Sequence, residues 1–465
     1  MILPESIRGA AARFPDRAAI VAADGSVTTY ARLDAWSDEV AAWLVDEHGI
    51  AEGAVVGLVL PSGPEYVAAY LALAKLGAVT AGTNPFLAPP ERARVLELLA
   101  PDLVLEAIGA RQRPLLPREC GSDGGGDVVV VFTSGSTGVP KGATFGDAQL
   151  RAVVELDVGS LDTWGTGGPM LTGTALPHIG FMTKLPWYLR TGATLLLQEK
   201  WSASNTLRLA QQHRLASIGG VSAQIGLLLR QPDFDRYDLD SVKTLVVGGG
   251  PSPLELVREA CTRFGAGYSI RYSSTESGGC GTGTAFDADD DEYRTVGRPR
   301  PGVEVRIDDA SGEVLMRSGA VMSRYWRDPA LTAATLNDGW LRTGDLGELD
   351  EATGLLRLVG RTTDMYIRGG YNVHPQEVEA VLLEHPAVAQ VAVAARPDGV
   401  MGEIGVAVVV LRDGHGAPTV DDLRAFAADR LAAYKLPEAM VTVDALPLTT
   451  MDKLDRRRLA ELAAG

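Results

Sequence analysis

Cysteine is scarce in this chain: three residues in 465, namely Cys120, Cys261 and Cys280. They are far apart, form no CxxC pair and have no histidines at metal-ligand spacing. A disulfide framework and a structural zinc site both need clustered, regularly spaced cysteines, so the pattern argues against either.

Excess positive charge and long apolar runs are also missing. The formal net charge is −16, and the only compact basic segment is 456–458, which argues against a nucleic-acid partner. No window reaches the roughly 18 uninterrupted apolar residues of a membrane span. Residues 1–19 have the pattern of an amphipathic helix with an early acid, unlike a basic and then apolar signal sequence, so we expect a cytoplasmic protein.

What the chain does contain is an alternation of helical and strand patterns. Helices are predicted at 38–45 and 65–78, and apolar strands at 54–60 and 78–83. This alternation is typical of a doubly wound parallel sheet. After a segment rich in Pro and Gly at 111–126, predicted to be a surface connection, further strands are expected at 193–198, 215–221 and 244–250.

The pattern changes towards the C-terminus. From Val296 short strands and turns predict a small β-barrel or antiparallel sheet. After Arg361, helices are predicted at 374–385 and 420–434, around strands at 388–397 and 404–413. We therefore predict an α/β protein with a large N-terminal domain of doubly wound sheets and a small β-barrel-like part, 1–361, followed by a small mobile α+β domain, 362–465.

The stretch FTSGSTGVPKG at 132–142 is typical of a phosphate-binding loop. Glycine amides and hydroxyls can surround a phosphate, and Lys141 adds a point charge. It is not a Walker loop, because Lys141 lies between Pro140 and Gly142, where no helix begins and no Ser or Thr is available for Mg²⁺. The alternative is a surface turn after a buried strand. The candidate phosphate ligands are Thr133, Ser134, Gly135, Ser136, Thr137, Gly138 and Lys141.

Four later segments follow this loop in a fixed order: RYSSTES at 271–277, GWLRTGDLG at 339–347, GRTTDMYIRGGYNVHPQEVE at 360–379 and LPLTTMDKLDRRRL at 446–459. Together with the loop they resemble the adenylate-forming superfamily, which comprises acyl-CoA synthetases, luciferases and carrier-protein adenylation domains. The resemblance extends from about residue 14 to Lys453 and implies both a fold and a reaction class.

The resemblance implies a nucleotide site. Tyr272 would lie against the adenine, Thr275 would contact the α-phosphate, and Glu276 would bind Mg²⁺, for which a carboxylate is a suitable hard ligand. Asp345 would bind the ribose hydroxyls, and Arg361 would reach the ribose or the phosphates. Taken alone, RYSSTES fits a plain strand-to-turn segment equally well, and GWLRTGDLG fits a hairpin turn.

It also implies the groups that carry the chemistry. Lys453 would neutralise the attacking carboxylate and the α-phosphate, although a lysine near the C-terminus is ordinarily a solvated charge; Lys435 is the second candidate. Gly369 and Gly370 would provide a wall for a pantetheine arm. His178 would lie near the acyl carboxylate and thiol entrance, or be a structural histidine beside apolar residues.

The acid pocket is expected near His178, Gly249, Gly250, Ser273 and Gly278. Arg271 would either reach a second anionic group on the substrate or face solvent. Three positions depart from the usual family residues, namely Ser273, Thr363 at the pivot and Asp452 beside the catalytic lysine.

The implied activity is that of an AMP-forming acid–thiol ligase that uses ATP, Mg²⁺ and coenzyme A. Alternatives within the superfamily are a stand-alone adenylation enzyme that serves a carrier protein or an amine, and a specialised biosynthetic enzyme that activates an oxyanion such as nitrite for an arylamine. A binding protein without turnover is a fourth possibility, but the presence of Lys453 and Glu276 argues against it.

Overall fold

The computed structural model describes residues 1–84, 87–111, 126–133, 140–361, 364–369, 371–448 and 454–464. The chain divides into two compact units, which are described separately. The first unit comprises residues 1–305, 316–342 and 352–355; the second comprises 306–315, 343–351 and 356–465.

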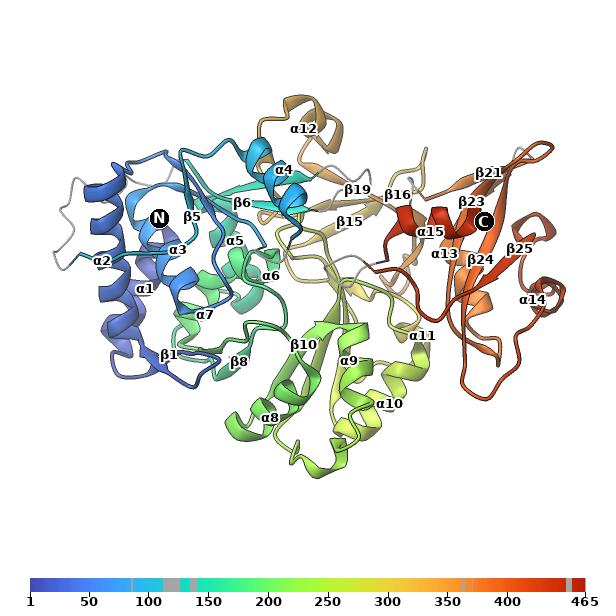
Figure 1. Cartoon of the computed structure of the whole chain (residues 1–465), viewed down its shortest axis with the longest axis horizontal. Helices are drawn as coiled ribbons and strands as arrows, with labels where there is room; N and C mark the ends of the chain where they lie inside the picture. The colour runs from blue at the N-terminus through green and yellow to red at the C-terminus, as the bar shows by residue number, and fades with distance from the viewer. Residues whose placement is uncertain are drawn as a thin grey trace. The chain divides into compact units, whose positions relative to one another are not determined.

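The first sheet of unit 1 has six strands in the order β17-β7-β6-β4-β3-β5 (Figure 1). Its parallel strands are β3 (Val55–Leu58), β4 (Val79–Gly82), β5 (Leu103–Leu105) and β6 (Asp127–Thr133), and its antiparallel strands are β7 (Lys141–Gly146) and β17 (Arg324–Tyr325). The four consecutive valines of β6 are buried, as expected for an interior strand of a sheet covered on both faces.

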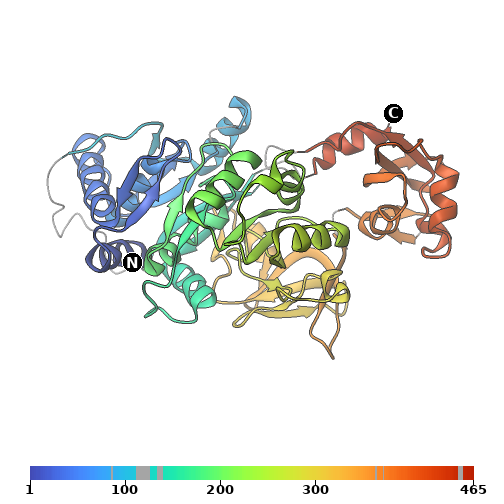
Figure 2. The ribbon, with the colours of Figure 1, turned by 90° about the horizontal axis from the view of Figure 1, so that it is seen from below.

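Helices α1 (Ile2–Arg13), α2 (Tyr30–His48) and α3 (Pro64–Leu76) lie against one another (Figures 1 and 2). α3 connects two parallel strands, β3 and β4, and is buried on nearly all sides. An all-round apolar sequence such as YVAAYLALA is typical of a helix enclosed in this way. Helix α4 (Pro89–Leu99) makes the next crossover, from β4 to β5.

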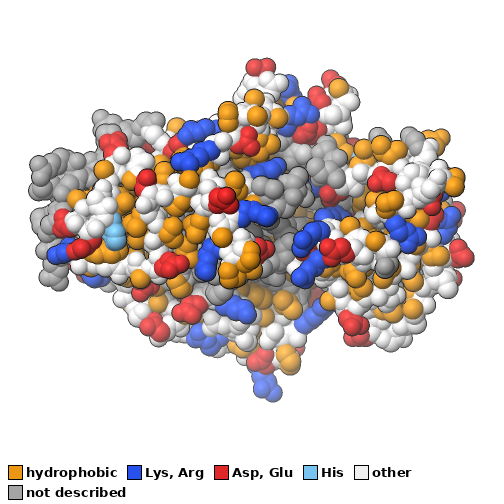
Figure 3. Space-filling view, turned by 45° about the horizontal axis from the view of Figure 1, so that its top comes forward, with side chains coloured by type: hydrophobic (Ala, Val, Ile, Leu, Met, Phe, Trp, Pro, Cys, Tyr) orange, Lys and Arg blue, Asp and Glu red, His pale blue; other side chains and the backbone are white. Residues whose placement is uncertain are grey.

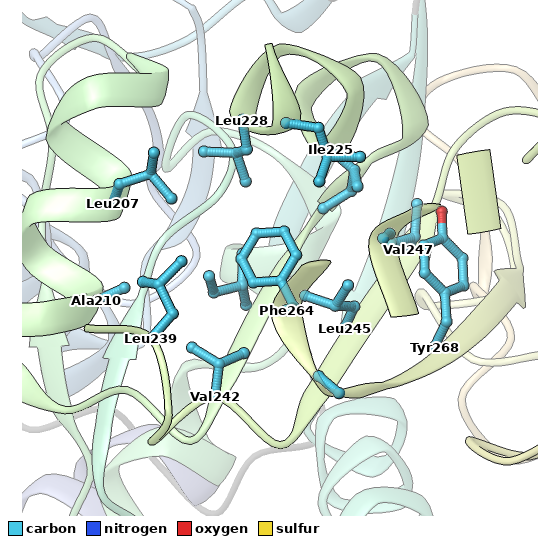
Figure 4. Packing of buried hydrophobic residues seen from close by; sticks show 14 of the residues in the cluster. Leu207, Ala210, Ile225, Leu228, Leu239, Val242, Leu245, Val247, Phe264 and Tyr268 are labelled. Carbon is cyan, nitrogen blue, oxygen red and sulfur yellow. The ribbon is translucent and has the colours of Figure 1, made fainter. Parts of the chain in front are cut away.

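A second sheet of unit 1 has the order β10-β11-β12-β13-β14. Three parallel strands, β10 (Ser217–Val221), β11 (Thr244–Gly248) and β12 (Gly267–Tyr272), are followed by the antiparallel β13 (Thr282–Gly283) and β14 (Arg298–Pro299). Its helices are α8 (Ala203–His213), α9 (Ser222–Leu229), α10 (Leu254–Phe264) and α11 (Asp290–Tyr293). Side chains from these helices and strands form one apolar core, which includes Leu207, Ile225, Leu245 and Phe264 (Figure 4).

The third sheet of unit 1 has the order β2-β1-β9-β8. Its strands are β1 (Ala18–Val21), β2 (Val27–Thr29), β8 (Pro169–Leu171) and β9 (Thr194–Leu196). In the sequence, α5 (Asp147–Val158) precedes β8, and α6 (Ile179–Met182) and α7 (Leu185–Thr191) lie between β8 and β9. Two further elements of unit 1, α12 (Pro329–Thr335) and β18 (Leu336–Asn337), precede β19 (Trp340–Leu349).

Unit 2 contains a β-rich part and an α+β part. Strands β15 (Glu304–Ile307) and β16 (Glu313–Arg317), with β19 and β20 (Leu356–Arg361), make the predicted antiparallel region. The α+β part has the sheet order β22-β21-β24-β23, with β25 beside β24. Its strands are β21 (Tyr366–Arg368), β22 (Tyr371–Val373), β23 (Val388–Asp398), β24 (Gly402–Leu411) and β25 (Ala439–Thr442); its helices are α13 (Pro375–Leu382), α14 (Val420–Ala427) and α15 (Arg456–Ala464).

The predicted fold class is confirmed, but one predicted helix ends well before its expected end. The predicted helix 420–434 ends at Ala427 in α14, and the chain continues through turns to a short 3-10 helix, Ala433–Lys435. In this conformation Leu431 and Tyr434 pack against the apolar core that lies under α13 and α14. The alanine-rich sequence favours a continued helix, but here the chain adopts turns in which these two side chains are packed. The predicted connection 111–126 falls almost wholly outside the described residues.

The molecular surface carries charges of both signs. Basic and acidic side chains are interspersed among hydrophobic ones on the face shown in Figure 3. Among the described residues, no helix is both long enough and apolar enough to cross a membrane.

Candidate active site

The phosphate-binding candidate lies at the end of a β-hairpin. Thr133, the last residue of β6, is paired with Lys141, the first residue of β7. The loop between them therefore leaves and re-enters neighbouring antiparallel strands, whereas a Walker loop leads from a strand into a helix. The candidate ligands between these residues, Ser134, Gly135, Ser136, Thr137 and Gly138, lie outside the described residues.

Tyr325 is a neighbour of both Lys141 and Glu276. Its hydroxyl donates a hydrogen bond of 2.8 Å to Oε1 of Glu276, and the Lys141 ammonium lies 6.0 Å from the centroid of its ring. Burial, and then the nearby Glu276 carboxylate, raise the pKa of Tyr325 well above its usual value, so the phenol stays protonated and remains a donor. Two residues predicted to act on the same phosphates thus share a neighbour that the sequence did not indicate.

The turn at 274–279 holds Thr275 and Glu276 in a fixed backbone conformation. The amide of Ser274 donates to Oγ of Ser277 at 3.0 Å, and the amide of Ser277 donates back to Oγ of Ser274 at 3.1 Å. The amide of Gly278 donates to the carbonyl of Thr275, and the carbonyl of Glu276 accepts from Met322 at 2.8 Å. Because the backbone is anchored on both sides, the two candidate side chains are presented from a rigid support.

Glycine is required at the end of this turn. Gly278 has φ +71°, a conformation that residues with a side chain rarely adopt, and a Cβ there would overlap the carbonyl oxygen of Ala320. Tyr272 ends β12, and Ser273 is exposed at the start of the turn. The candidates from 272 to 278 therefore form one contiguous structural feature.

The other acid-pocket candidates come from two further segments of the chain. Gly249 and Gly250 follow β11 and are exposed, and β11 is paired with β12 in parallel, so both strands end at the same edge of the sheet. This carboxyl edge is the usual ligand position in open α/β sheets. His178 is the half-buried residue before α6, and Ile179 of α6 lies 3.6 Å from the position that a Cβ on Gly279 would take.

In unit 2, Asp345 and Arg361 form a pair. They are opposite each other on β19 and β20, and Nε of Arg361 lies 2.7 Å from Oδ1 of Asp345. The Asp345 side chain is only 7% exposed, whereas that of Arg361 is 51% exposed. The backbone around Asp345 is fixed by Thr343, whose Oγ1 accepts from the Asp345 amide. A carboxylate held this firmly, with an arginine beside it, is suited to bind hydroxyl groups.

The remaining candidates belong to the C-terminal part of unit 2. Gly369 follows β21 with φ +55°, and its amide donates to the carbonyl of Met401 at 2.8 Å. Gly370 and Lys453 lie outside the described residues, as do Thr363 and Asp452. Lys435, the alternative lysine, forms an ion pair with Glu377 and is partly buried.

Comparison with known proteins gives a consistent result along the chain. The AMP-binding enzyme model matches residues 7–125 and 122–326, and the AMP-binding enzyme C-terminal domain model matches 377–453. The indoleacetate–CoA ligase of Aromatoleum aromaticum is 32% identical over 98% of this chain and 95% of the relative.

Two solved structures are similar over almost the whole chain. The amide bond synthetase from Marinactinospora thermotolerans has a TM-score of 0.86 and 29% identity, covering 100% of both chains. The o-succinylbenzoate CoA synthetase from Bacillus subtilis, in complex with ATP and magnesium ion, has a TM-score of 0.86 and 27% identity, covering 98% of both. The chain belongs to the AMP-binding enzyme family and is an AMP-forming ligase.

Proposed function

We propose that this enzyme is an acid–thiol ligase for a small or medium-sized aryl or otherwise hydrophobic carboxylic acid. It converts ATP and the acid to an acyl adenylate and pyrophosphate, and then transfers the acyl group to coenzyme A. The observation that carries the proposal is the convergence of Lys141, at the end of the phosphate loop, and Glu276 on Tyr325. It is supported by the CoA ligases among the relatives.

Charge repulsion is the barrier that these residues must overcome. The acid and the α-phosphate are both anions, and their repulsion at about 4 Å amounts to several kcal/mol at an effective dielectric near 20. Lys453 would neutralise both groups while the carboxylate oxygen attacks the α-phosphorus and pyrophosphate leaves. Lys141 and the loop 133–138 would hold the leaving phosphates, and Thr275 would contact the α-phosphate.

The residues present fit a magnesium ion. Besides the carboxylate oxygen that accepts from Tyr325, Glu276 has a second hard oxygen, and Lys141 lies near the ring of the same tyrosine. When bound there, Mg²⁺ would offset negative charge on the phosphates. Tyr272 would contact adenine, and Asp345 with Arg361 would bind the ribose.

We propose that residues 1–361 bind ATP and the acid, and that residues 362–465 supply different groups to the two steps of the reaction. Adenylate formation would need Lys453, whereas thiol transfer would use the wall made by Gly369 and Gly370 after the smaller part has moved. His178, Gly249, Gly250, Ser273 and Gly278 would border the acid.

The acceptor has a second candidate. The similarity to an amide bond synthetase favours an amine in place of the thiol, and a carrier-protein thiol or an oxyanion such as nitrite are further variants of the same activation. Supplying coenzyme A, a carrier protein and amines in separate reactions, and identifying the acylated product by mass spectrometry, distinguishes these acceptors.

The proposed activation is tested by pyrophosphate release. Purified enzyme with ATP, Mg²⁺ and a broad panel of acids is expected to release pyrophosphate only when a suitable acid is present. An enzyme that binds ATP but shows no acid-dependent release with any member of the panel would contradict the proposal.

A further inference from the structure

Beside the 274–279 turn lies a group of ionised side chains to which the proposed chemistry assigns no role. Asp157 accepts from two cations: Lys184 lies 2.6 Å from one carboxylate oxygen and Arg300 lies 3.1 Å from the other. Burial alone would raise the pKa of Asp157, but the two cations hold it below its usual value. Both oxygens of this carboxylate are therefore engaged, and its charge is already shared between two partners.

Arg271 adds a third cation to this group. It lies opposite Gly283 on β13, and a Cβ at Gly283 would overlap its guanidinium, so the glycine makes room for the side chain. Burial, and then the nearby Arg300, lower the pKa of Arg271, and the attraction of Asp157 offsets them only in part. Within the described part of the chain, no carboxylate lies at ion-pair distance from it; its close neighbour is the ring of Phe286, 5.6 Å from the guanidinium carbon.

The four side chains thus carry three positive charges and one negative charge in a partly buried position. A half-buried cation with no carboxylate at ion-pair distance loses solvation that a more distant acid, here Asp157, restores only in part. The chain nevertheless has an arginine at this position, and the glycine opposite leaves room for its side chain. Such an arrangement is explained when an anionic group from outside the chain completes it.

The group adjoins the predicted acid pocket. The Cε atom of Lys184 lies 3.7 Å from the position of a Cβ on Gly279, and Thr183 donates to the carbonyl of Gly278 at 3.2 Å. The amide of Arg300 donates to the carbonyl of Gly281 at 3.1 Å. Lys184 therefore borders the turn that carries Thr275 and Glu276, and Arg300 is bonded to the backbone just after this turn.

We propose that the acid substrate carries a second anionic group, such as a second carboxylate, which binds Arg271 with additional attraction from Arg300 and Lys184. The inference depends on the proposed function, because it specifies the acid within that reaction. A guanidinium can donate two parallel hydrogen bonds to a carboxylate, which makes arginine selective for such a group. Arg271 would then determine specificity while the first carboxylate reacts.

The test uses matched acids with one and two carboxylates: heptanoate and heptanedioate, and phenylacetate and 2-carboxyphenylacetate. Pyrophosphate release gives kcat/KM for each. We expect kcat/KM of the wild type to be about 10- to 100-fold higher for the diacid of a pair, as for a hydrogen bond between charged groups.

Arg271→Met should bring this ratio of diacid to monoacid kcat/KM towards one, mainly through KM, and Arg271→Lys should keep part of the preference. Arg214→Met, at an exposed arginine paired with Asp238, is the control and should keep the full ratio.

Thermal unfolding provides a second measurement that needs no turnover. Heptanedioate should raise the Tm of the wild type more than heptanoate does, and this difference should disappear in Arg271→Met. Equal ratios and equal Tm shifts in the wild type and Arg271→Met would overturn the inference, while acid-dependent pyrophosphate release with single carboxylates would leave the proposed function standing. Absence of release with every acid would refute the function, and the Tm comparison would then decide the inference.

Discussion

At the scale of single residues, the hydroxyl oxygen of Tyr325 is the atom whose removal gives the clearest test. Its hydroxyl orients Glu276, while its ring lies near Lys141. Tyr325→Phe removes the hydrogen bond and keeps the ring. Because removal of a group that orients a metal ligand weakens metal affinity by about 10- to 100-fold, we expect the Mg²⁺ concentration needed for half-maximal ATP binding to rise by about 10-fold or more. Titration calorimetry of ATP at graded Mg²⁺ concentrations measures this change.

Tyr237 offers a matched control for that experiment. Its hydroxyl also donates to a carboxylate, Asp233, at 3.3 Å, but at the end of the short 3-10 helix Phe234–Arg236. Tyr237→Phe should leave the Mg²⁺ dependence unchanged. Equal Mg²⁺ dependence in wild type and Tyr325→Phe would mean that Glu276 needs no such support.

The sequence indicated the motif residues but not the side chains around them. Lys141 was proposed from the chemistry of its loop, and Glu276 from the resemblance to the adenylate-forming superfamily; both assignments remain predictions. Tyr325 lies 49 residues after Glu276, and Arg300 lies 143 residues after Asp157. No periodicity or composition links positions so far apart, since their proximity is created by strand pairing and packing.

At the scale of elements, the turn at 274–279 is the feature most sensitive to substitution. Gly278 and Gly279 both have positive φ, +71° and +75°. A Cβ on Gly278 would overlap the backbone of Ala320, whereas one on Gly279 would meet only ordinary contacts of 3.6 and 3.7 Å. An alanine at Gly279 therefore tests the cost of backbone strain alone, whereas an alanine at Gly278 adds a steric overlap.

We expect Gly279→Ala to lower the free energy of unfolding by about 1–2 kcal/mol, the cost of a left-handed backbone for a residue with a side chain. Gly278→Ala should cost more, because the backbone of Ala320 must also move. Urea unfolding monitored by tryptophan fluorescence compares the two. Equal losses would show that the contact with Ala320 relaxes without cost.

Elements with a strong periodic pattern were predicted from the sequence. The apolar run of β6 and the enclosed helix α3 were both expected, because burial of many consecutive side chains leaves a clear signature. The end of α14 was not, since the alanine-rich segment after Ala427 fits a helix equally well. There the packing of Leu431 and Tyr434 decided the conformation, and packing partners cannot be deduced from a local window.

At the scale of the whole molecule, the proposed roles are distributed over the full length of the chain. The order of the motifs predicted this distribution and the fold class, because each motif has a fixed place in the superfamily. The roles of the individual residues remain predictions, and the catalytic lysine is the one on which the reaction mechanism depends most.

Lys453→Ala should separate adenylate formation from the other steps. Loss of a charge that stabilises the transition state typically costs about 100- to 1,000-fold in kcat, so acid-dependent pyrophosphate release should fall by that factor while ATP binding is kept. Transfer to coenzyme A from a chemically prepared acyl adenylate should persist, because the activated acyl group no longer needs charge neutralisation. Lys435→Ala, which loses an ion pair with Glu377, is the control. If Lys435→Ala abolished pyrophosphate release and Lys453→Ala did not, the catalytic role would belong to Lys435.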